Sequence, residues 1–555
     1  MKKINGMLFG VILFSAQISL ALNSALTKDS LTIGMSAEFE NLNPLISSQA
    51  ATKYMLYLAW RPLVILTPDN QWKPLIIKQI PTIENKLAKK KGEGLEAVIE
   101  IIDNAKWGDG TPLSCKDIEF AWQVGKSKNV SNPNREPFEN ITSIFADKAN
   151  PKKCTLNFAK TKFDYFQTMP DPLPAHLEEA VFNKYGSKAE GYDLNSLYTK
   201  NPTNPGLYFG PYVISEVKLG SHLIFTPNPY FYGKAPEFKK IIFKLVPNNA
   251  TLEANLRSGI IDMISSAAGL GLDQAVIFDK KVKSENLPYS VIFEDGVVYA
   301  HIDMNLDSPI LSDLKVRKAL SVSFNKKEMI QSLLEGRGRP ANHFVTEKDP
   351  WFTDQVEKYA YNKRESARLL EEAGWKMGPK GYREKNGQTL SLNLLAAAGA
   401  KLNEMIEVYL QEKFKAIGAE LLVKNEPPRV FFGETVSHRK FDLAMYSWVS
   451  VPESSPRSTL HSSMIPSAKN SWAGQNYPGY KNTEVDHLIE RLEEELNPQK
   501  RASLAKKIIE AYVRDIPVIP VYYRPNNCVI PKALKNFRLS GHVFYETLTA
   551  EDWTL

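Results

Sequence analysis

The sequence contains few of the residues that mark an enzyme or a metal protein. Its 555 residues include only three cysteines and eight histidines. None of them forms a CxxC pair, an HExxH pair or another close metal-ligand spacing. The sequence also lacks a G-x-S-x-G nucleophile elbow and a phosphate-binding P-loop. It therefore predicts no catalytic residue, no metal site and no cofactor.

Long hydrophobic runs are missing beyond the first residues. Lys2 and Lys3 precede an apolar stretch at 7–14 (MLFGVILF), and small residues follow at Ser19 and Ala21. This pattern predicts a secretory signal peptide over 1–21, with an uncleaved anchor as the alternative. No cysteine closely follows the stretch, so the protein is not expected to be a lipoprotein. We expect a periplasmic protein without stable membrane insertion.

A strong excess of charge is also missing. Removal of 1–21 takes away two lysines and leaves a formal net charge of +5. The one dense basic run, at 86–91, lacks interleaved aromatic residues and is followed by Gly92 and Gly94. It is interpreted as a solvated loop tip, and no nucleic-acid partner is expected.

The three cysteines leave the disulfide state open. In an oxidising compartment one disulfide could form, and Cys115 and Cys154 are closer in sequence to each other than to Cys528. The favoured interpretation is three isolated thiols.

Short apolar strands alternate with amphipathic helices along the chain. Strands are predicted at 30–35, 241–246 and 419–423, and helices at 363–373, 403–416 and 484–494. A mature chain of about 530 residues is long enough for two or three domains. The mixture of elements predicts α/β lobes.

A turn followed by a helix is predicted at 107–122. Asp109-Gly110 favours a tight turn, and Ser114 with Asp117 forms a capping box. The helix would place Ile118, Ala121 and Trp122 in the core.

This segment is the first of several that together resemble one family. Residues 107–118 are similar to the W-x-D-G-x-P motif of the family 5 extracellular solute-binding proteins, the peptide and nickel receptors of ABC importers. Further matches follow in the same order at 210–212 (GPY), 228–233 (NPYFYG), 254–262 (ANLRSGIID), 301–305 (HIDMN), 316–320 (VRKAL), 361–374, 415–418 (KAIG), 441–443 (FDL), 480–482 (YKN) and 517–522 (PVIPVY). The resemblance spans residues 31–540.

The resemblance implies an α/β two-lobed periplasmic-binding-protein fold with an extra subdomain on lobe I and a hinge crossed twice. Lobe I would take 22–66, 205–296 and 525–555, the extra subdomain 67–204, and lobe II 297–524. The implied function is a receptor rather than an enzyme, which encloses a peptide or peptide-like ligand between its lobes. Its partner would be an inner-membrane ABC permease complex, and the receptor itself would be a monomer.

The resemblance also implies a set of ligand-binding residues around the strand at 444–451 (AMYSWVSV). This chain has Met445 and Val451 where peptide receptors carry an Arg and an Asp, so Glu453 and Arg457 are taken as substitutes. The loop at 206–210 (GLYFG) would place two aromatic side chains at the lobe I surface. The predicted ligand-binding residues are Glu38, Phe39, Tyr208, Asn305, Tyr446, Trp448, Val449, Ser450, Glu453 and Arg457, with Glu40 as a further acidic candidate.

Two other interpretations stay open. The same fold could bind a nickel chelate, a sugar or a signalling peptide. From another class, the chain could be a secreted α/β hydrolase, which the missing nucleophile and metal motifs disfavour.

Overall fold

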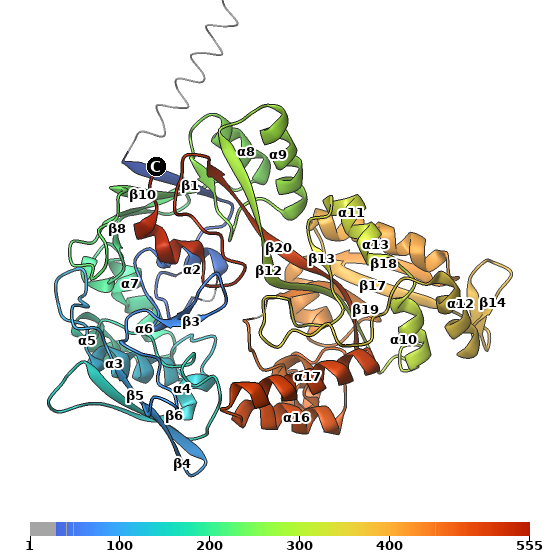
Figure 1. Ribbon diagram of the computed structural model, residues 1–555, viewed down its shortest axis with the longest axis horizontal. Helices are drawn as coiled ribbons and strands as arrows, with labels where there is room; N and C mark the ends of the chain where they lie inside the picture. Colours follow the sequence, from blue (N-terminus) through green and yellow to red (C-terminus); the bar gives the residue numbers. More distant parts are fainter. Residues whose placement is uncertain (1–28, 40, 48, 450) are drawn as a thin grey trace, which may run out of the picture. The chain divides into compact units, whose positions relative to one another are not determined.

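The computed structural model describes residues 29–39, 41–47, 49–449 and 451–555. The predicted signal peptide, Glu40 and Ser450 lie outside the described residues. The chain divides into two compact units. Among the described residues, unit 1 comprises those from 29 to 271, Phe278–Ile292 and Asn527–Leu555, and unit 2 comprises Leu272–Ile277 and those of Phe293–Asn526. Each unit combines helices with a β-sheet (Figure 1), which confirms the predicted α/β architecture.

The main sheet of unit 1 is built on β1 (Ser30–Met35). This strand pairs in parallel with β10 (Lys240–Leu245) and β11 (Met263–Ile264). Antiparallel strands β9 (His222–Pro227) and β8 (Tyr212–Lys218) extend it beyond β10. The buried apolar side chains of the two strands belong to the core of the unit: Leu31, Ile33 and Met35 of β1, and Ile241 and Phe243 of β10. The strands predicted at 30–35 and 241–246 are confirmed.

Helices and a short hairpin complete this part of unit 1. The hairpin joins β2 (Val64–Leu66) to β3 (Trp72–Pro74). The helices are α2 (Ala50–Leu56), α3 (Cys115–Lys126), α4 (Glu136–Asn140), α5 (Ala175–Tyr185), α6 (Gly191–Asn195), α7 (Leu197–Lys200) and α8 (Asn249–Arg257).

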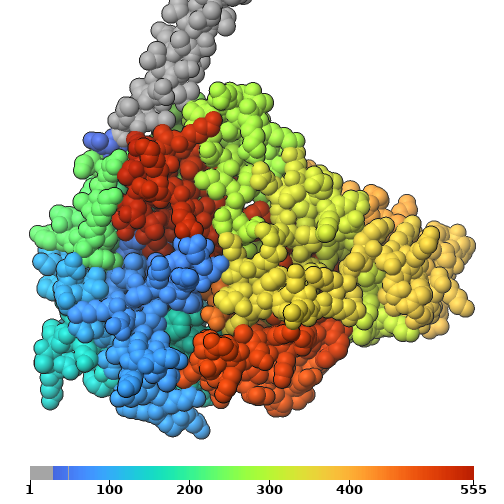
Figure 2. All heavy atoms as spheres, viewed as in Figure 1, coloured from blue at the N-terminus to red at the C-terminus, as the bar shows by residue number. Residues whose placement is uncertain are grey.

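A second, antiparallel sheet of unit 1 has the order β4-β5-β7-β6. Its strands are β4 (Ala88–Lys91), β5 (Gly94–Glu100), β6 (Ile141–Ala146) and β7 (Lys153–Phe158). The predicted loop tip at 86–91 is wrong for its last three lysines, which form strand β4. Gly92 has a φ of 62°, which permits the tight turn that pairs Lys91 with Gly94. The lysines are exposed, and the hairpin lies at the surface of unit 1 (Figure 2).

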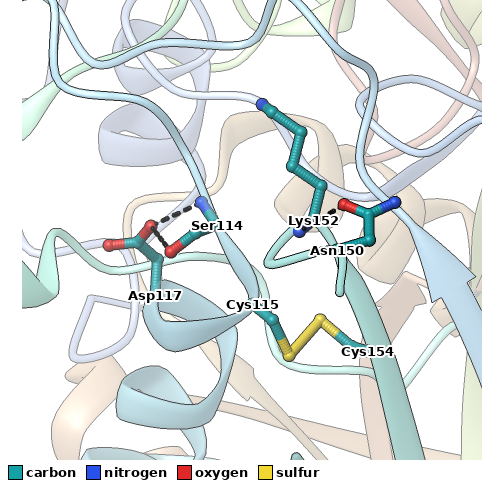
Figure 3. The surroundings of a disulfide bond; sticks show 6 residues. All are labelled: Ser114, Cys115, Asp117, Asn150, Lys152 and Cys154. Atoms are coloured by element: carbon teal, nitrogen blue, oxygen red, sulfur yellow. Dashed lines mark hydrogen bonds between the residues drawn. A yellow bond between two sulfur atoms is a disulfide. The ribbon is translucent and has the colours of Figure 1, made fainter. Parts of the chain in front are cut away.

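Helix α3 begins where the sequence predicts, and a disulfide links it to the second sheet. The Ser114 backbone N–H donates to the Asp117 carboxylate at 2.8 Å, which forms part of the capping box. Ile118 and Ala121 are fully buried, and Trp122 is 8% exposed. Cys115, at the start of α3, forms a disulfide with Cys154 of β7 (Figure 3). The favoured interpretation of three isolated thiols is therefore wrong, because the packing of α3 on this sheet brings the two cysteines together. Cys528 is a buried free thiol.

The sheet of unit 2 has the order β18-β17-β19-β12-β20. Strand β17 (Ser391–Ala397) is parallel to β18 (Glu420–Glu426) and β19 (Leu443–Val449), whereas β12 (Tyr289–Met304) is antiparallel to β19. The short β13 (Arg339–Pro340) pairs with β20 (Val518–Pro531). A smaller sheet contains β14 (Lys376–Met377), β15 (Arg383–Lys385) and β16 (Gln388–Thr389).

Helices α10 (Leu314–Ser321), α11 (Lys326–Leu334), α12 (Lys363–Glu372) and α13 (Lys401–Lys415) share a hydrophobic core with one face of the unit 2 sheet. Ile302, Leu392 and Leu394 of the sheet are fully buried in this core. Helices α16 (Thr483–Glu494) and α17 (Pro498–Asp515) form part of the unit's surface (Figure 2). The predicted strand at 419–423 and the predicted helices at 363–373, 403–416 and 484–494 are confirmed.

The chain passes between the units within long strands. It enters unit 2 between Ile292 and Phe293 of β12 and returns to unit 1 between Asn526 and Asn527 of β20. The first half of α9 (Leu272–Ser284) is grouped with unit 2 and the second half with unit 1. In the described parts of the chain, every helix is too short or too polar to span a bilayer.

Candidate functional site

Strand β19 carries the predicted ligand-binding segment, and its two faces differ. Leu443 and Met445 are buried in the helix-covered core of unit 2. Tyr446 and Trp448 lie on the other face, because side chains alternate along a strand. Tyr446 is buried, Trp448 is half-buried, and the next residue, Val449, is 57% exposed. The end of β19 therefore brings aromatic and apolar groups to the surface of unit 2.

Strand β12 adds two more rings to this face. Tyr299 lies opposite Trp448, and His301 lies opposite Tyr446. The His301 imidazole is stacked against the rings of Tyr299, at a centroid distance of 4.9 Å, and Trp448, at 6.4 Å. Trp448 is also stacked against Tyr477, at 6.2 Å. Such rings combine flat apolar faces with N–H and O–H groups at their edges, which suits contact with varied ligand groups.

A buried acid lies next to this aromatic cluster. Asp303 accepts a hydrogen bond from the Tyr446 hydroxyl at 2.5 Å. Its Oδ1 lies 3.4 Å from His301 Nε2, which has no hydrogen-bond partner within the described chain. Burial raises the pKa of Asp303 to about 7, although the Tyr446 hydrogen bond opposes this, and burial lowers the pKa of His301 to about 4. Burial thus favours the neutral form of both groups.

A small cavity of about 30 Å³ adjoins the pair within unit 2. Tyr299, His301, Asp303 and Trp448 line it. This volume has room for about two water molecules, which is too little for a peptide side chain of ordinary size. The part of the cluster that can contact a ligand is therefore the half-buried ring of Trp448, whereas the exposed Val449 lies on the opposite face of β19.

Three other predicted site residues of unit 2 already have partners inside the unit. The Asn305 side-chain amide donates to the carbonyl oxygens of Arg439, at 3.1 Å, and Phe441, at 3.0 Å. Glu453 lies 3.4 Å from Arg501, and Arg457 forms an ion pair with Glu493 at 2.8 Å. A ligand would have to compete with these contacts. Their role in ligand binding stays a prediction.

The predicted site residues of unit 1 have different environments. A Glu38 carboxylate oxygen accepts a hydrogen bond from the Gly220 N–H at 2.5 Å, and Phe39 packs against the core. Tyr208 and Phe209 are fully buried, and the Tyr208 hydroxyl donates to the Pro202 carbonyl. The expectation that these two aromatic rings lie at a surface is wrong, because they pack in the interior of unit 1. Ligand binding by Glu38, Phe39 and Tyr208 stays a prediction.

Two groups of candidate ligand-binding residues are not among those predicted from the sequence. Tyr299, His301 and Asp303 alternate with apolar residues along β12, and this period of two was an available signal. Lys53 and Asp171, which line a cavity of unit 1, come from distant segments without any local motif. Across the described residues, no group of three or more His, Cys, Asp or Glu side chains is placed to hold a metal ion.

Comparison with protein families gives a match over most of the chain. The family model described as bacterial extracellular solute-binding proteins, family 5 Middle, matches residues 82–470. An oligopeptide-binding protein of Bacillus subtilis, AppA, is 23% identical over 485 residues, which cover 84% of this chain and 82% of that protein. The nickel-binding periplasmic protein of Escherichia coli is 25% identical over 447 residues, which cover 80% of this chain and 79% of that protein.

Solved structures resemble the chain over nearly its whole length. The oligopeptide-binding protein from Thermus thermophilus, complexed with a pentapeptide, aligns with a TM-score of 0.73 and 25% identity. That alignment covers 95% of this chain and 96% of the Thermus chain. NikZ from Campylobacter jejuni, in complex with Ni(L-His), aligns with a TM-score of 0.75 and 24% identity, covering 95% of this chain and all of that one. At 24% identity, the likeness to NikZ shows a shared fold and nothing more.

Proposed function

Because the chain belongs to family 5 of the bacterial extracellular solute-binding proteins, we propose that it is the periplasmic receptor of an ABC importer, with an oligopeptide or a peptide-like compound as its solute. The family match over residues 82–470 carries the proposal. Both a peptide-binding relative and a peptide-bound structure with 25% identity support the ligand class.

The remaining features of the proposal follow from that role. Unit 1 would be lobe I with its extra subdomain at 67–204, and unit 2 would be lobe II. The receptor would act as a monomer, without lipid attachment, and would deliver its solute to an inner-membrane permease complex. The solute would contact the half-buried ring of Trp448, which β19 presents next to Tyr446.

Mass spectrometry of the material released when the purified protein is denatured tests the ligand class. We expect a mixture of short peptides or peptide-like compounds, absent from a mock preparation. Release of a single sugar, or of a metal chelate alone, would contradict the peptide proposal and leave the receptor role intact.

We also propose that the protein binds its solute without chemical change. The bound peptides should be recovered intact after prolonged incubation at saturating concentration. Saturable, metal-independent hydrolysis of a peptide, ester or glycoside by the purified protein would overturn this and favour the hydrolase.

A nickel chelate is a second candidate solute. The Escherichia coli nickel-binding protein is as similar in sequence as the peptide-binding relatives. A chelate supplies most of its own metal ligands, so one histidine of the receptor would be enough to complete them. Metal analysis of protein purified from nickel-supplemented medium should give well below one nickel per chain if the peptide proposal holds.

A further inference from the structure

The aromatic surface of unit 2 includes a ring that belongs to a loop. The ring of Trp448 contacts those of His301 on β12, Tyr446 on β19 and Tyr477. Tyr477 is stacked against Trp448, with a centroid distance of 6.2 Å and an angle of 13° between the ring planes. The hydrogen bonds of the sheet fix the first two neighbours, whereas Tyr477 lies in the loop at 473–480, outside the helices and strands. The position of the Tyr477 ring therefore depends on the contacts of this loop.

Arg439, in the turn before β19, makes several of these contacts. Its Nε donates a hydrogen bond to the Tyr477 carbonyl oxygen at 2.8 Å, and its Nη2 donates to the Pro478 carbonyl oxygen at 3.3 Å. The Leu306 N–H donates to the same Pro478 oxygen at 2.9 Å. A guanidinium is planar and its donors point in fixed directions, so it can hold two neighbouring carbonyl groups in one geometry.

The same guanidinium is anchored to the segment that follows β12. Arg439 Nη2 also donates to Asn305 Oδ1 at 3.1 Å, and Nη1 forms an ion pair with Asp307 at 2.8 Å. The Asn305 side-chain amide in turn donates to the Arg439 carbonyl oxygen at 3.1 Å. The Arg439 side chain is only 12% exposed. Arg439 thus joins the end of β12 and the start of β19 to the loop that carries Tyr477.

The backbone of this region is fitted to the guanidinium. Arg439 has a φ of 57°, in the left-handed region that residues with a Cβ seldom adopt. Such a conformation persists where the surrounding contacts enforce it, and it is found frequently at ligand sites. Gly479 has a φ of 76°, and a Cβ at this position would overlap Arg439 Nη2. Glycine at 479 therefore leaves the space that the guanidinium occupies.

We infer that Arg439 is a positioning residue for solute binding, and that it acts by holding Tyr477 against the ring of Trp448. This inference rests on the proposed function, in which the solute contacts Trp448. A ring that is already fixed loses less conformational freedom when a ligand contacts it, so the affinity is higher. The inference also assigns Asn305 to the support of Arg439 instead of to direct contact with the ligand.

The first measurement follows the Trp448 ring itself. The full-length mature protein is labelled with fluorotryptophan, stripped of bound material and compared with Arg439→Gln by fluorine NMR. The Trp448 signal is the one that is absent from Trp448→Phe. Gln at position 439 keeps the Cβ and its backbone strain but loses the charge and the forked donors. We expect the Trp448 signal to shift in Arg439→Gln, because the stacked ring of Tyr477 is released.

The second measurement is the affinity for a peptide. Stripped wild-type protein is exposed to a pool of synthetic tripeptides to pentapeptides, and mass spectrometry identifies the peptide that is retained most. Isothermal titration calorimetry then gives its Kd for each variant. We expect Arg439→Gln to weaken binding about fivefold. Arg439→Lys should weaken it equally, because an ammonium keeps the charge but lacks the planar fork. In the Trp448→Ala background, Arg439→Gln should cause no further loss.

Two further variants make the comparison specific. Asp307→Asn removes the charge of the ion-pair partner, whose side chain is 57% exposed, and keeps an oxygen acceptor for Nη1. It should retain both the wild-type affinity and the wild-type Trp448 signal, since exposed ion pairs contribute little. Gly479→Ala places a methyl group against Nη2 and should weaken binding without a change at Arg439. This variant tests the same contact if the Arg439 variants do not fold.

Each contrary outcome has a defined meaning. An unshifted Trp448 signal in Arg439→Gln, or an unchanged affinity, overturns the inference and leaves the proposed function intact. A loss of affinity that recurs in the Trp448→Ala background also overturns it, because Arg439 then acts by another route. If Trp448→Ala keeps full affinity, the proposed solute contact is wrong and the inference fails with it. A wild type that retains no peptide of the pool overturns the proposed peptide ligand and the inference that rests on it.

Discussion

At the scale of single residues, Trp448 offers the sharpest test of the surface on unit 2. Its ring is half-buried, with stacked neighbours at His301 and Tyr477. We expect Trp448→Ala to lower the affinity for a co-purified peptide at least tenfold, since loss of an aromatic contact commonly costs about 2 kcal/mol. Isothermal titration calorimetry measures the change.

The matched control for this prediction is Trp472→Ala. Trp472 is 37% exposed, and its ring contacts His438 in the same unit. The Trp472→Ala variant should leave the affinity for the peptide unchanged. If Trp448→Ala lowers the melting temperature and leaves the affinity intact, the ring is a packing residue and the ligand lies elsewhere.

The buried pair His301 and Asp303 should make stability depend on pH in opposite directions. The pKa of His301 is about 4 in the fold and about 6.5 in the unfolded chain, so its stabilising contribution is present above pH 6.5 and is lost as the pH falls toward 4. The pKa of Asp303 is about 7 in the fold, above its ordinary value of 3.8, so its contribution is present below pH 3.8 and is lost as the pH rises toward 7.

Urea unfolding at pH 4.5 and pH 7 separates the two groups. Relative to the wild type, His301→Gln should be less stable at pH 7 than at pH 4.5 by up to about 3 kcal/mol. Asp303→Asn should show the reverse, with its relative stability greater at pH 7. Changes of the same sign in both variants would mean that the two groups titrate as an ion pair.

At the scale of elements, the disulfide joins the first residue of α3 to β7. Cys115 and Cys154 are separated by 39 positions, and a loop of this size constrains the unfolded chain by about 4 kcal/mol in the chain-entropy account. We expect the Cys115→Ser, Cys154→Ser double variant to lose about 2–4 kcal/mol of unfolding free energy.

Chemical denaturation under oxidising conditions measures this loss, with Cys528→Ser as the matched control. Cys528 is a buried free thiol, so its replacement should leave the effect of a reducing agent unchanged. If reduction does not destabilise the wild type, the disulfide makes no contribution to stability.

At the scale of the whole molecule, two long strands connect the two units. The chain crosses within the 16-residue β12 and again within the 14-residue β20. A connection of a few backbone positions can bend while each unit keeps its own core. We therefore expect a bound peptide to lower the radius of gyration, because a ligand held by both units favours the closed state.

Small-angle X-ray scattering of stripped and peptide-saturated protein measures that change. The control is the same titration with Trp448→Ala at a peptide concentration that saturates only the wild type. An identical scattering profile with and without a tightly bound peptide would contradict closure.

Much of the fold follows from local sequence signals. The capping box at Ser114 and Asp117, the apolar alternation of 30–35 and the helical period of 403–416 act over a few residues, so their structures were predictable. The order of the short motifs also identified the family that the comparisons show. Local hydrogen bonds and periodicity determine such features without knowledge of the fold.

Only the tertiary structure decided what depends on distant segments. The pairing of Cys115 with Cys154, the burial of Tyr208 and the meeting of Lys53 and Asp171 at one cavity have no local signature. The shifted pKa values of His301 and Asp303 likewise come from burial beneath side chains remote in sequence. Burial and proximity are properties of packing, and packing joins residues that the sequence alone leaves far apart.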